Sequence, residues 1–282
     1  MVRADLHCHS SASDGTRPPA EVIARAAAAG LDAIALTDHD TVAGIAEAAT
    51  ALPRGLTLIP GMELSCRRDG HSVHLLSYLF DPEHEELAAQ VLAIRQSRVE
   101  RARAMVTTLN ELGVPVTWEQ VSAIAGDGVI GRPHVARAMI EAGVISSVDE
   151  AFTPEWIGPG GRAHVSRYAL DPADAIALVH AAGGVTSLAH PLAVTRGWMV
   201  PDDFIAELAL AGLDGAEVAH PDHDPAQRDQ LRAVARRLGL VTTGGSDDHG
   251  QLTGDRIGCE STGQEDLGRL LERATGAPVI TR

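Results

Sequence analysis

The stretch Asp5-Leu6-His7-Cys8-His9-Ser10 lies near the start of the 282-residue chain and runs into a turn at Asp14-Gly15. Because side chains in a strand alternate between its two faces, His7 and His9 are expected to point the same way. Two imidazoles at the end of a strand form half of a metal site, although a His-x-His pair alone is equally consistent with simple hydrogen bonding. The rest of the chain decides between these two interpretations.

Every other segment with the pattern of a strand also ends in side chains that can bind a metal. These residues are Asp38, His39, Glu63, His74, His190, His220, Asp247, Asp248 and His249. The expected strands alternate with helices, which implies a mainly parallel sheet, and about seven such units favour an α/β barrel over an open sheet. In a barrel the carboxyl ends of the strands share one mouth, so we expect the candidates to converge there.

The pattern changes between residues 81 and 167, where no strand is evident. One long helical pattern covers about 87–112, and shorter patterns follow near 118–124 and 132–142. Glycines separate these pieces, as expected for short helices joined by turns.

We therefore predict two domains. A barrel formed by residues 1–85 and 165–282 carries the metal site, and residues 86–164 form a helical insertion. The insertion leaves after the His74 strand and returns before the His190 strand, so both its ends are expected beside the mouth. We predict that it forms a lid.

The composition narrows the class of protein. With 3% aromatic residues, the core must be built mostly from Ala, Val, Leu and Ile, which suits buried strands and Ala-rich helices. No apolar run is long enough to span a membrane, and no signal peptide pattern is visible. The three cysteines have no paired short spacing, so we predict a cytoplasmic protein without disulfides or membrane contact.

The formal net charge of −15 argues against a surface for duplex DNA. Most of this charge can be an ordinary solvated surface. A subset falls in the candidate segments: Asp14, Asp38, Asp40, Glu63, Asp247 and Asp248. Carboxylates gathered so densely repel one another unless cations lie among them.

The donor set indicates which cations these are. Imidazole and carboxylate without thiolate suit Zn, Mn, Fe or Mg. About nine nitrogen and oxygen donors exceed the needs of one ion, so we predict two to three divalent ions. The alternative is that these side chains are only polar caps at strand ends, or, for His74 and His190, hydrogen-bonded strand residues.

These segments also resemble a known family. Asp-Leu-His-Cys-His-Ser with Ser-Asp-Gly, Leu-Thr-Asp-His-Asp, Gly-Met-Glu-Leu-Ser, Ala-His-Pro and Gly-Ser-Asp-Asp-His are similar to the motifs of the PHP (polymerase and histidinol phosphatase) metal-dependent phosphoesterases. The resemblance covers about residues 1–80 and 165–260. The insertion, with Gly131-Arg132-Pro133-His134, is similar to that of small stand-alone members that act on nucleoside phosphates and short RNA 5′ ends.

The resemblance implies a distorted (β/α)7 barrel with a trinuclear site. It assigns His7, His9, Glu63 and Asp247 to one ion. Glu63 is shared with a second ion that also takes His74 and His190. Asp14, His39 and His249 hold the third.

The reaction that such a site permits is attack of a metal-bound hydroxide on phosphorus, because metal binding lowers the pKa of water to about 7. The candidate catalytic residues are Glu63, together with Asp38, His220 or His223 as the acid that protonates the leaving group. The candidate substrate contacts are Arg132, His134, Arg167 and His223. The turn that holds His220 and His223 is equally consistent with a surface loop, and Arg132 with a surface contact.

The predicted function is hydrolysis of phosphate monoesters of nucleotides, such as AMP or 3′,5′-bisphosphates, with trimming of short single-stranded RNA from its 5′ end. One alternative is a histidinol-phosphate phosphatase, which shares the metal site. Another is a non-catalytic metal-binding PHP module, although this chain retains every ligand of the pattern. The sequence leaves the native metal, the preferred base and the oligomeric state open.

Overall fold

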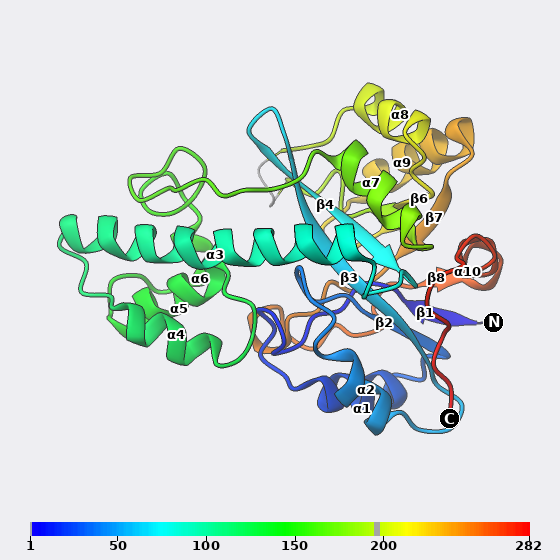
Figure 1. Ribbon diagram of the computed structural model, residues 1–282, viewed down its shortest axis with the longest axis horizontal. Coiled ribbons are helices and arrows are strands. Elements are labelled where there is room, and N and C mark those ends of the chain that lie inside the picture. The colour runs from blue at the N-terminus through cyan, green and yellow to red at the C-terminus, as the bar shows by residue number, and fades with distance from the viewer. Residues whose placement is uncertain (1, 195–197) are drawn as a thin grey trace. The chain divides into compact units, whose positions relative to one another are not determined.

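The structure, a computed structural model, describes residues 2–194 and 198–282. Within them an eight-stranded sheet has the order β7-β6-β5-β4-β3-β2-β1-β8 (Figure 1). Its strands are β1 (Arg3–Asp5), β2 (Ala33–Leu36), β3 (Thr57–Arg68), β4 (His71–Tyr78), β5 (Val185–Leu188), β6 (Gly215–Ala219), β7 (Val241–Gly244) and β8 (Thr262–Gly263). The chain divides into two compact units, Met1–Gln90 with Ala169–Arg282, and Val91–Tyr168.

The sheet curls into a nearly closed barrel. The N–H of Leu6 donates to the carbonyl of Gly244 at 3.2 Å, and the N–H of Asp247 donates to the carbonyl of His7 at 2.8 Å. The exit of β1 therefore pairs with the exit of β7, and the predicted α/β barrel is confirmed.

Two strands, β4 and β8, do not run parallel to their neighbours in the sheet. β4 is antiparallel to both β3 and β5, and β8 is antiparallel to β1. Asp69 and Gly70 join β3 to β4 with φ values of 50° and 84°. Both values belong to a tight hairpin turn, which leaves no room for the crossover helix that a parallel strand needs.

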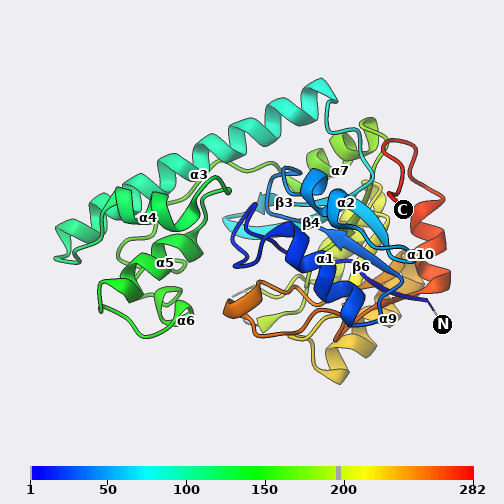
Figure 2. The same ribbon diagram turned by 90° about the horizontal axis from the view of Figure 1, so that it is seen from below.

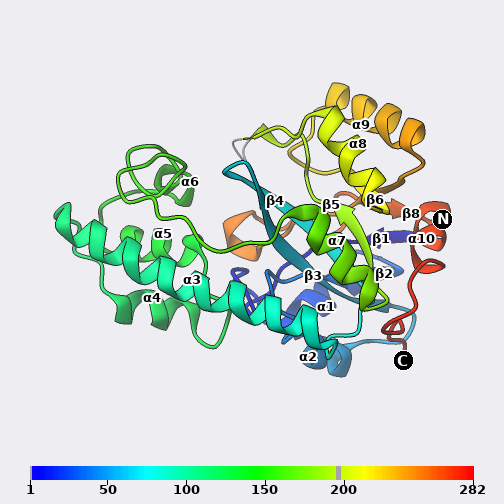
Figure 3. The ribbon, with the colours of Figure 1, turned by 45° about the horizontal axis from the view of Figure 1, so that its top comes forward.

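Helices cover the outside of the barrel. α1 (Pro19–Ala28) and α2 (Ile45–Ala51) lie beside β1 to β3 (Figure 2). α7 (Pro172–Ala181), α8 (Asp202–Leu210) and α9 (Pro225–Leu238) lie beside β5 to β7 (Figure 3), and α10 (Gln264–Leu271) follows β8. No helix in the described parts of the chain has the length and apolar composition needed to cross a membrane.

The ends of α9 illustrate how the sequence determines where a helix begins and ends. The Asp224 carboxylate accepts a hydrogen bond from the N–H of Gln227, and the Gln227 side chain accepts one from the N–H of Asp224, both at 2.8 Å. This reciprocal cap satisfies two amides of the first turn, and Pro225 fits the first helical position. Gly239 ends the helix with a φ of 72°.

Apolar side chains fill the inside of the barrel, so it is a packed core and not a pore. Its buried cluster includes Ala4, Leu6, Ala35, Ile59, Leu76, Tyr78 and Val241. The hydroxyl of Tyr78, fully buried, donates to the carbonyl of Leu6 at 2.9 Å.

The second unit is helical and has its own core. It contains most of α3 (Glu85–Glu111), with α4 (Trp118–Ala125), α5 (Arg132–Glu141) and α6 (Val148–Ala151). Its buried cluster includes Met105, Leu109, Val116, Val135 and Met139. The sequence places the insertion at 86–164, whereas the compact unit is Val91–Tyr168, because α3 continues across the first boundary without a break.

The first strand is shorter than predicted. The sequence suggests a strand from residue 4 to 9, but the paired strand ends at Asp5. Beyond it the chain stays extended because loops, not strands, supply the partners: Thr37 donates its N–H to the carbonyl of Cys8, and the N–H of His9 donates to Asp248, both at 2.9 Å. His7 and His9 therefore lie just outside the barrel, at its mouth.

Asp214, at the amino end of β6, provides a test of stability against pH. Although burial raises the pKa of its carboxyl, the bonds from His180 (2.8 Å) and the N–H of Thr186 (2.9 Å) lower it below the usual value. A lowered pKa means that the stabilisation is complete above the unfolded pKa and is lost as the pH falls through the folded pKa. We expect Asp214→Asn to lower the free energy of unfolding by about 1 kcal/mol at pH 7 and by less in acid. Urea unfolding at both pH values measures this, and an equal loss at both would contradict it.

Candidate metal centre

The structure brings the nine predicted metal ligands together at the mouth of the barrel. They are His7, His9, Asp14, His39, Glu63, His74, His190, Asp247 and His249. Eight of them are buried and His74 is partly buried. They come from the exits of β1, β2, β5 and β7 and from the β3–β4 hairpin.

Glu63 lies at the middle of this group, and its two carboxylate oxygens face different imidazoles. Its Oε2 lies 3.4 Å from Nε2 of His7 and 3.2 Å from Nε2 of His9. Its Oε1 lies 2.7 Å from Nδ1 of His74 and 3.1 Å from Nε2 of His190. A carboxylate between two sets of nitrogen donors has the arrangement of a bridging ligand.

A second cluster surrounds Asp14. Its Oδ1 is 3.4 Å from Nε2 of His249, and its Oδ2 is 3.7 Å from Nε2 of His39. With His9, these residues offer four ligand atoms that all lie within 4.8 Å of one another. Such a spacing suits one cation shared by all four.

Asp247 joins the clusters from the β7 exit. Its Oδ1 lies 3.2 Å from Nε2 of His7, 3.3 Å from Nε2 of His9 and 3.5 Å from Nδ1 of His249. The residue has a φ of 49°, a conformation that Asp tolerates better than most side chains. Gly245, two residues earlier, packs so closely that a Cβ there would lie 2.5 Å from the backbone nitrogen of His7.

The electrostatics of the centre favour positive charge. Burial lowers the pKa of His9, but the carboxylates of Asp247 and Glu63 outweigh this effect and raise the pKa of His9 to about 10. Burial raises the pKa of Glu63, but nearby imidazoles, led by that of His39, hold it well below its usual range. The pKa of Asp14 is likewise held well below its usual range, by His39 and His249 against the effect of burial. Protons on the imidazoles or bound cations can supply the charge that these carboxylates attract.

The residues fit divalent metal ions. The Nε2 atoms of His7 and His9 lie 3.2 Å apart and face the same carboxylates, and Nδ1 of His9 is buried without a hydrogen-bond partner among the described residues. Buried polar atoms normally have partners, so this arrangement needs a further group. Nitrogen and oxygen donors without thiolate suit Zn, Mn, Fe or Mg.

Glu217 is a member of the site that the sequence analysis missed. It is fully buried on β6, and its Oε1 lies 3.1 Å from Nδ1 of His7. Its Oε2 accepts the N–H of His190 at 2.8 Å. A carboxylate that accepts the Nδ1 hydrogen of His7 leaves Nε2 of that ring to face a metal. A glutamate inside the otherwise apolar strand pattern of β6 was the available signal.

We expect Glu217→Gln to weaken metal binding by about 10-fold, because the amide can still accept the hydrogen bond from His7 but no longer carries the charge. Metal titration against a chromogenic chelator measures the affinity directly. Wild-type affinity in this variant would reduce Glu217 to a packing residue.

The structure separates the three candidates for the general acid. The Asp38 carboxylate accepts hydrogen bonds from the N–H of Ser10 (2.8 Å), the hydroxyl of Ser10 (2.6 Å) and the hydroxyl of Ser13 (2.6 Å). These bonds hold the loop between His9 and Asp14. Asp38 is thus engaged in shaping the ligand loop.

His220 and His223 differ in whether a ring nitrogen faces the metal centre. Nδ1 of His220 accepts the N–H of Asp222 at 3.0 Å, and its Nε2 lies 3.4 Å from Oδ2 of Asp247. His223 instead bonds to backbone through both nitrogens, with Nδ1 3.1 Å from the carbonyl of Val218 and Nε2 accepting the N–H of Leu192 at 3.2 Å. Of the two rings, His220 faces the centre and His223 holds the loop.

Two further charged residues of the barrel support the ligand loops. Asp248 accepts hydrogen bonds from Arg17 and from the N–H of Gly250, both at 3.0 Å, and so is occupied by the protein itself. Arg256 donates to the carbonyl of Asp247 at 2.8 Å. Both interactions fix the backbone that presents Asp247 and His249.

The predicted substrate contacts Arg132, His134 and Arg167 belong to the helical unit. The Arg132 guanidinium lies 4.6 Å from the centre of the Phe152 ring. Nδ1 of the buried His134 accepts the N–H of Gly131 at 2.9 Å, so this ring caps the start of α5. Arg167 donates to the carbonyl of Tyr168 at 3.1 Å.

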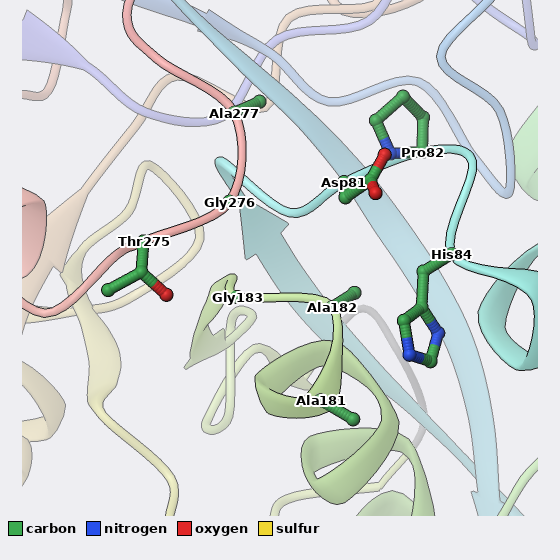
Figure 4. Close-up of a pocket in the computed structure, with 9 residues that line it drawn as sticks. All are labelled: Asp81, Pro82, His84, Ala181, Ala182, Gly183, Thr275, Gly276 and Ala277. Carbon is green, nitrogen blue, oxygen red and sulfur yellow. The ribbon is translucent and has the colours of Figure 1, made fainter.

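A separate cavity of about 410 Å³ lies at the other end of the barrel, near the end of β4 and the start of β5 (Figure 4). The described residues that line it, including Asp81, His84 and Thr275, contain none of the predicted ligands. This cavity is therefore separate from the predicted metal centre.

Comparison with known proteins agrees with the geometry. The PHP domain family matches residues 5–139. A 5′-3′ exoribonuclease of Haemophilus influenzae is 37% identical over 248 residues, which cover 87% of this chain and 89% of the relative. A 3′,5′-nucleoside bisphosphate phosphatase of Chromobacterium violaceum is 35% identical over 258 residues, covering 91% and 90%.

Two solved structures are also similar to this chain over almost its whole length. A protein of Bifidobacterium adolescentis, provisionally described as a metal-dependent phosphoesterase, has a TM-score of 0.89 at 33% identity, and the match covers 96% of both chains. An amidohydrolase of Chromobacterium violaceum, solved with bound sulfate and no metal, has a TM-score of 0.84 at 32% identity, covering 97% of this chain and 99% of that one. The chain therefore belongs to the PHP domain family, and it is an enzyme that hydrolyses phosphate esters.

Proposed function

We propose that this enzyme hydrolyses phosphate monoesters of nucleotides, including nucleoside 3′,5′-bisphosphates, and trims short single-stranded RNA from its 5′ end. The observation that carries the proposal is Glu63, whose two oxygens face two different sets of imidazoles. The names of the two relatives, an exoribonuclease and a bisphosphate phosphatase, support the substrate class. The acidic chain remains a poor partner for duplex DNA.

We propose two to three divalent ions, Mn, Fe, Zn or Mg, as cofactors. One would be held by His7, His9, Glu63 and Asp247, the second by Glu63, His74 and His190, and the third by Asp14, His39 and His249. Bound ions of this kind neutralise phosphate oxygens and lower the pKa of water to about 7.

His220 supplies a hydrogen-bond donor at the edge of the centre. Because Nδ1 of His220 accepts the N–H of Asp222, a neutral His220 carries its hydrogen on Nε2, which faces Asp247. This N–H can donate a hydrogen bond to a leaving oxygen at the edge of the centre and so stabilise the negative charge that develops on it. His223 cannot do so without breaking a backbone bond, and burial lowers the pKa of its ring, which keeps it neutral.

A panel of phosphate esters tests the proposed function. It contains a nucleoside 5′-monophosphate, a nucleoside 3′,5′-bisphosphate, a 5′-phosphorylated short RNA and histidinol phosphate. We expect hydrolysis of the nucleotides, loss of activity on chelation and recovery on adding Mn, Zn, Fe or Mg. Phosphate release from histidinol phosphate alone would favour the alternative substrate, and release that survives chelation would contradict the metal requirement.

Arg132 provides a test of the predicted substrate contact of the helical unit. If its guanidinium grips a phosphate, Arg132→Ala should keep the metals and lower kcat/KM for nucleotides by about 10- to 100-fold, the loss of one charged hydrogen-bonded contact. Steady-state kinetics with parallel metal analysis measures both effects. Unchanged kcat/KM for every ester would leave Arg132 as a packing residue over Phe152.

We also propose that the enzyme works in a reducing compartment such as the cytoplasm. Cys8 and Cys66 are buried, and Cys259 is exposed with a free thiol. An exposed free thiol is more typical of a reducing environment than of secreted proteins.

A further inference from the structure

The β3–β4 hairpin carries a row of polar side chains on the face that holds Glu63 and His74. The strand register places Ser65 opposite His74, and Arg67 opposite Ser72. Directly opposed residues share a face, and every second residue along a strand returns to that face. Arg67 and Ser72 are therefore the next pair beyond the predicted ligand His74.

The contacts along this face agree with the register. His74 has Nδ1 2.7 Å from Oε1 of Glu63 and Nε2 3.2 Å from the hydroxyl of Ser72. The opposite face of the hairpin is apolar nearer the barrel, where Leu64 and Val73 are buried. The polar row is thus continuous with the metal centre and leads outward from it.

Two adjacent arginines on β3 have opposite surroundings. Arg68 lies on the outer face, where Nε is 3.1 Å from Oδ2 of Asp171, a second nitrogen contacts Glu207, and the guanidinium covers the ring of Phe204 at 5.1 Å. Two carboxylates therefore neutralise this side chain, and an aromatic ring packs against it.

Arg67 lies on the metal-facing side, and none of the described residues gives its guanidinium such partners. Its backbone is fixed, because its N–H donates to the carbonyl of Leu170 at 2.8 Å, and the residue is half-buried. Its guanidinium makes no hydrogen bond or ion pair with any residue in 2–194 or 198–282. A half-buried arginine with an uncompensated charge is suited to bind an anion from solution, and its planar fork matches a phosphate in a bidentate way.

The separation of Arg67 from Glu63 along β3 indicates which anionic group of the substrate Arg67 can reach. Arg67 follows Glu63 by four residues, about 13 Å between Cα atoms at the usual rise of a strand. The Arg67 backbone is therefore well outside the metal centre, and its side chain serves a group of the substrate other than the reacting phosphate. In a nucleoside bisphosphate that group is the second phosphate, and in RNA it is the next phosphodiester.

We propose that Arg67 is a specificity-determining residue that binds this second phosphate. The inference rests on the proposed function, since it concerns the substrate of the same site. It explains how a strongly acidic chain selects substrates with two phosphate groups: the Arg67 guanidinium has no partner among the described residues and is available to the second phosphate. The attraction is partly exposed to solvent, so salt weakens it.

The test compares a nucleoside 3′,5′-bisphosphate with the corresponding 5′-monophosphate in the metal-loaded enzyme. We expect Arg67→Gln to lower kcat/KM for the bisphosphate by about 10- to 100-fold and to leave the monophosphate within about 2-fold. Metal content should equal that of the wild type. The matched control is Arg68→Gln, the neighbour on the other face, for which the ratio of the two kcat/KM values should not change. Raising the salt concentration should lower the wild-type preference and not that of Arg67→Gln.

The outcomes separate the inference from the proposed function. If the wild type hydrolyses neither nucleotide, the proposed function fails. If it hydrolyses both, and Arg67→Gln changes neither or lowers both equally, the proposed function stands and the assignment of Arg67 is overturned. Loss of metal in Arg67→Gln would also overturn it, since the residue would then act through the metal centre.

Discussion

Replacing Glu63 with glutamine is expected to remove at least one bound metal ion and to lower kcat for phosphate ester hydrolysis by at least about 100-fold. The reason is that the two carboxylate oxygens face different predicted ligands. One oxygen faces His7 and His9, and the other faces His74 and His190. Glutamine has the same shape but only one oxygen. Whichever way the amide turns, its NH2 group faces imidazole nitrogens that must keep their lone pairs for a metal.

Metal analysis of the purified variant, with kinetics at saturating metal, measures both effects. The control is Glu265→Gln, an exposed glutamate in the first turn of α10, which should keep wild-type metal content and rate. A Glu63→Gln enzyme with the metal content and kcat of the wild type would refute the bridging assignment.

The second large effect is expected for Asp247→Asn, again at least about 100-fold in kcat. Asparagine tolerates the φ of 49° at this position, so the backbone should keep its conformation while the charge is lost. The carboxylate currently faces the imidazole nitrogens of His7, His9 and His249 with one oxygen and His220 with the other. An amide must turn its NH2 group toward one of these two sets.

Thermal unfolding combined with metal titration distinguishes a site effect from a folding defect. We expect Asp247→Asn to fold with a Tm close to that of wild-type apoprotein but to bind metal more weakly. Asp229→Asn removes an equivalent charge from the exposed surface of α9 and should change neither quantity. Tight metal binding by Asp247→Asn would exclude Asp247 as a ligand.

The positions of the predicted ligands follow from the sequence because simple rules apply to them. An apolar run that ends in a polar residue is a buried strand leading to a loop, and parallel strands bring those loops to one mouth. This reasoning places His39 beside Asp247 and His249 although it is distant from them in the chain. The prediction that they bind metal is a chemical inference from that convergence and is tested by the variants above.

Other features do not follow from such rules. Glu217 lies inside a strand, and only the three-dimensional contact with Nδ1 of His7 identifies its role. The residue types of Asp38, His220 and His223 do not show which of them faces the centre, since that depends on the backbone amides that each one accepts in the folded loops. The antiparallel direction of β4 depends on the two-residue turn at Asp69, whose φ cannot be read from an alternating pattern.

The central claim is that these nine side chains form a multinuclear metal centre, and anomalous diffraction tests it most directly. A crystal of the protein, soaked in manganese or zinc, would be measured on both sides of the absorption edge of that metal. The account predicts two or three anomalous peaks at the mouth of the barrel, with Glu63 adjacent to two of them. Anomalous density absent from His7, His9 and Glu63, or present only at surface carboxylates, would contradict it.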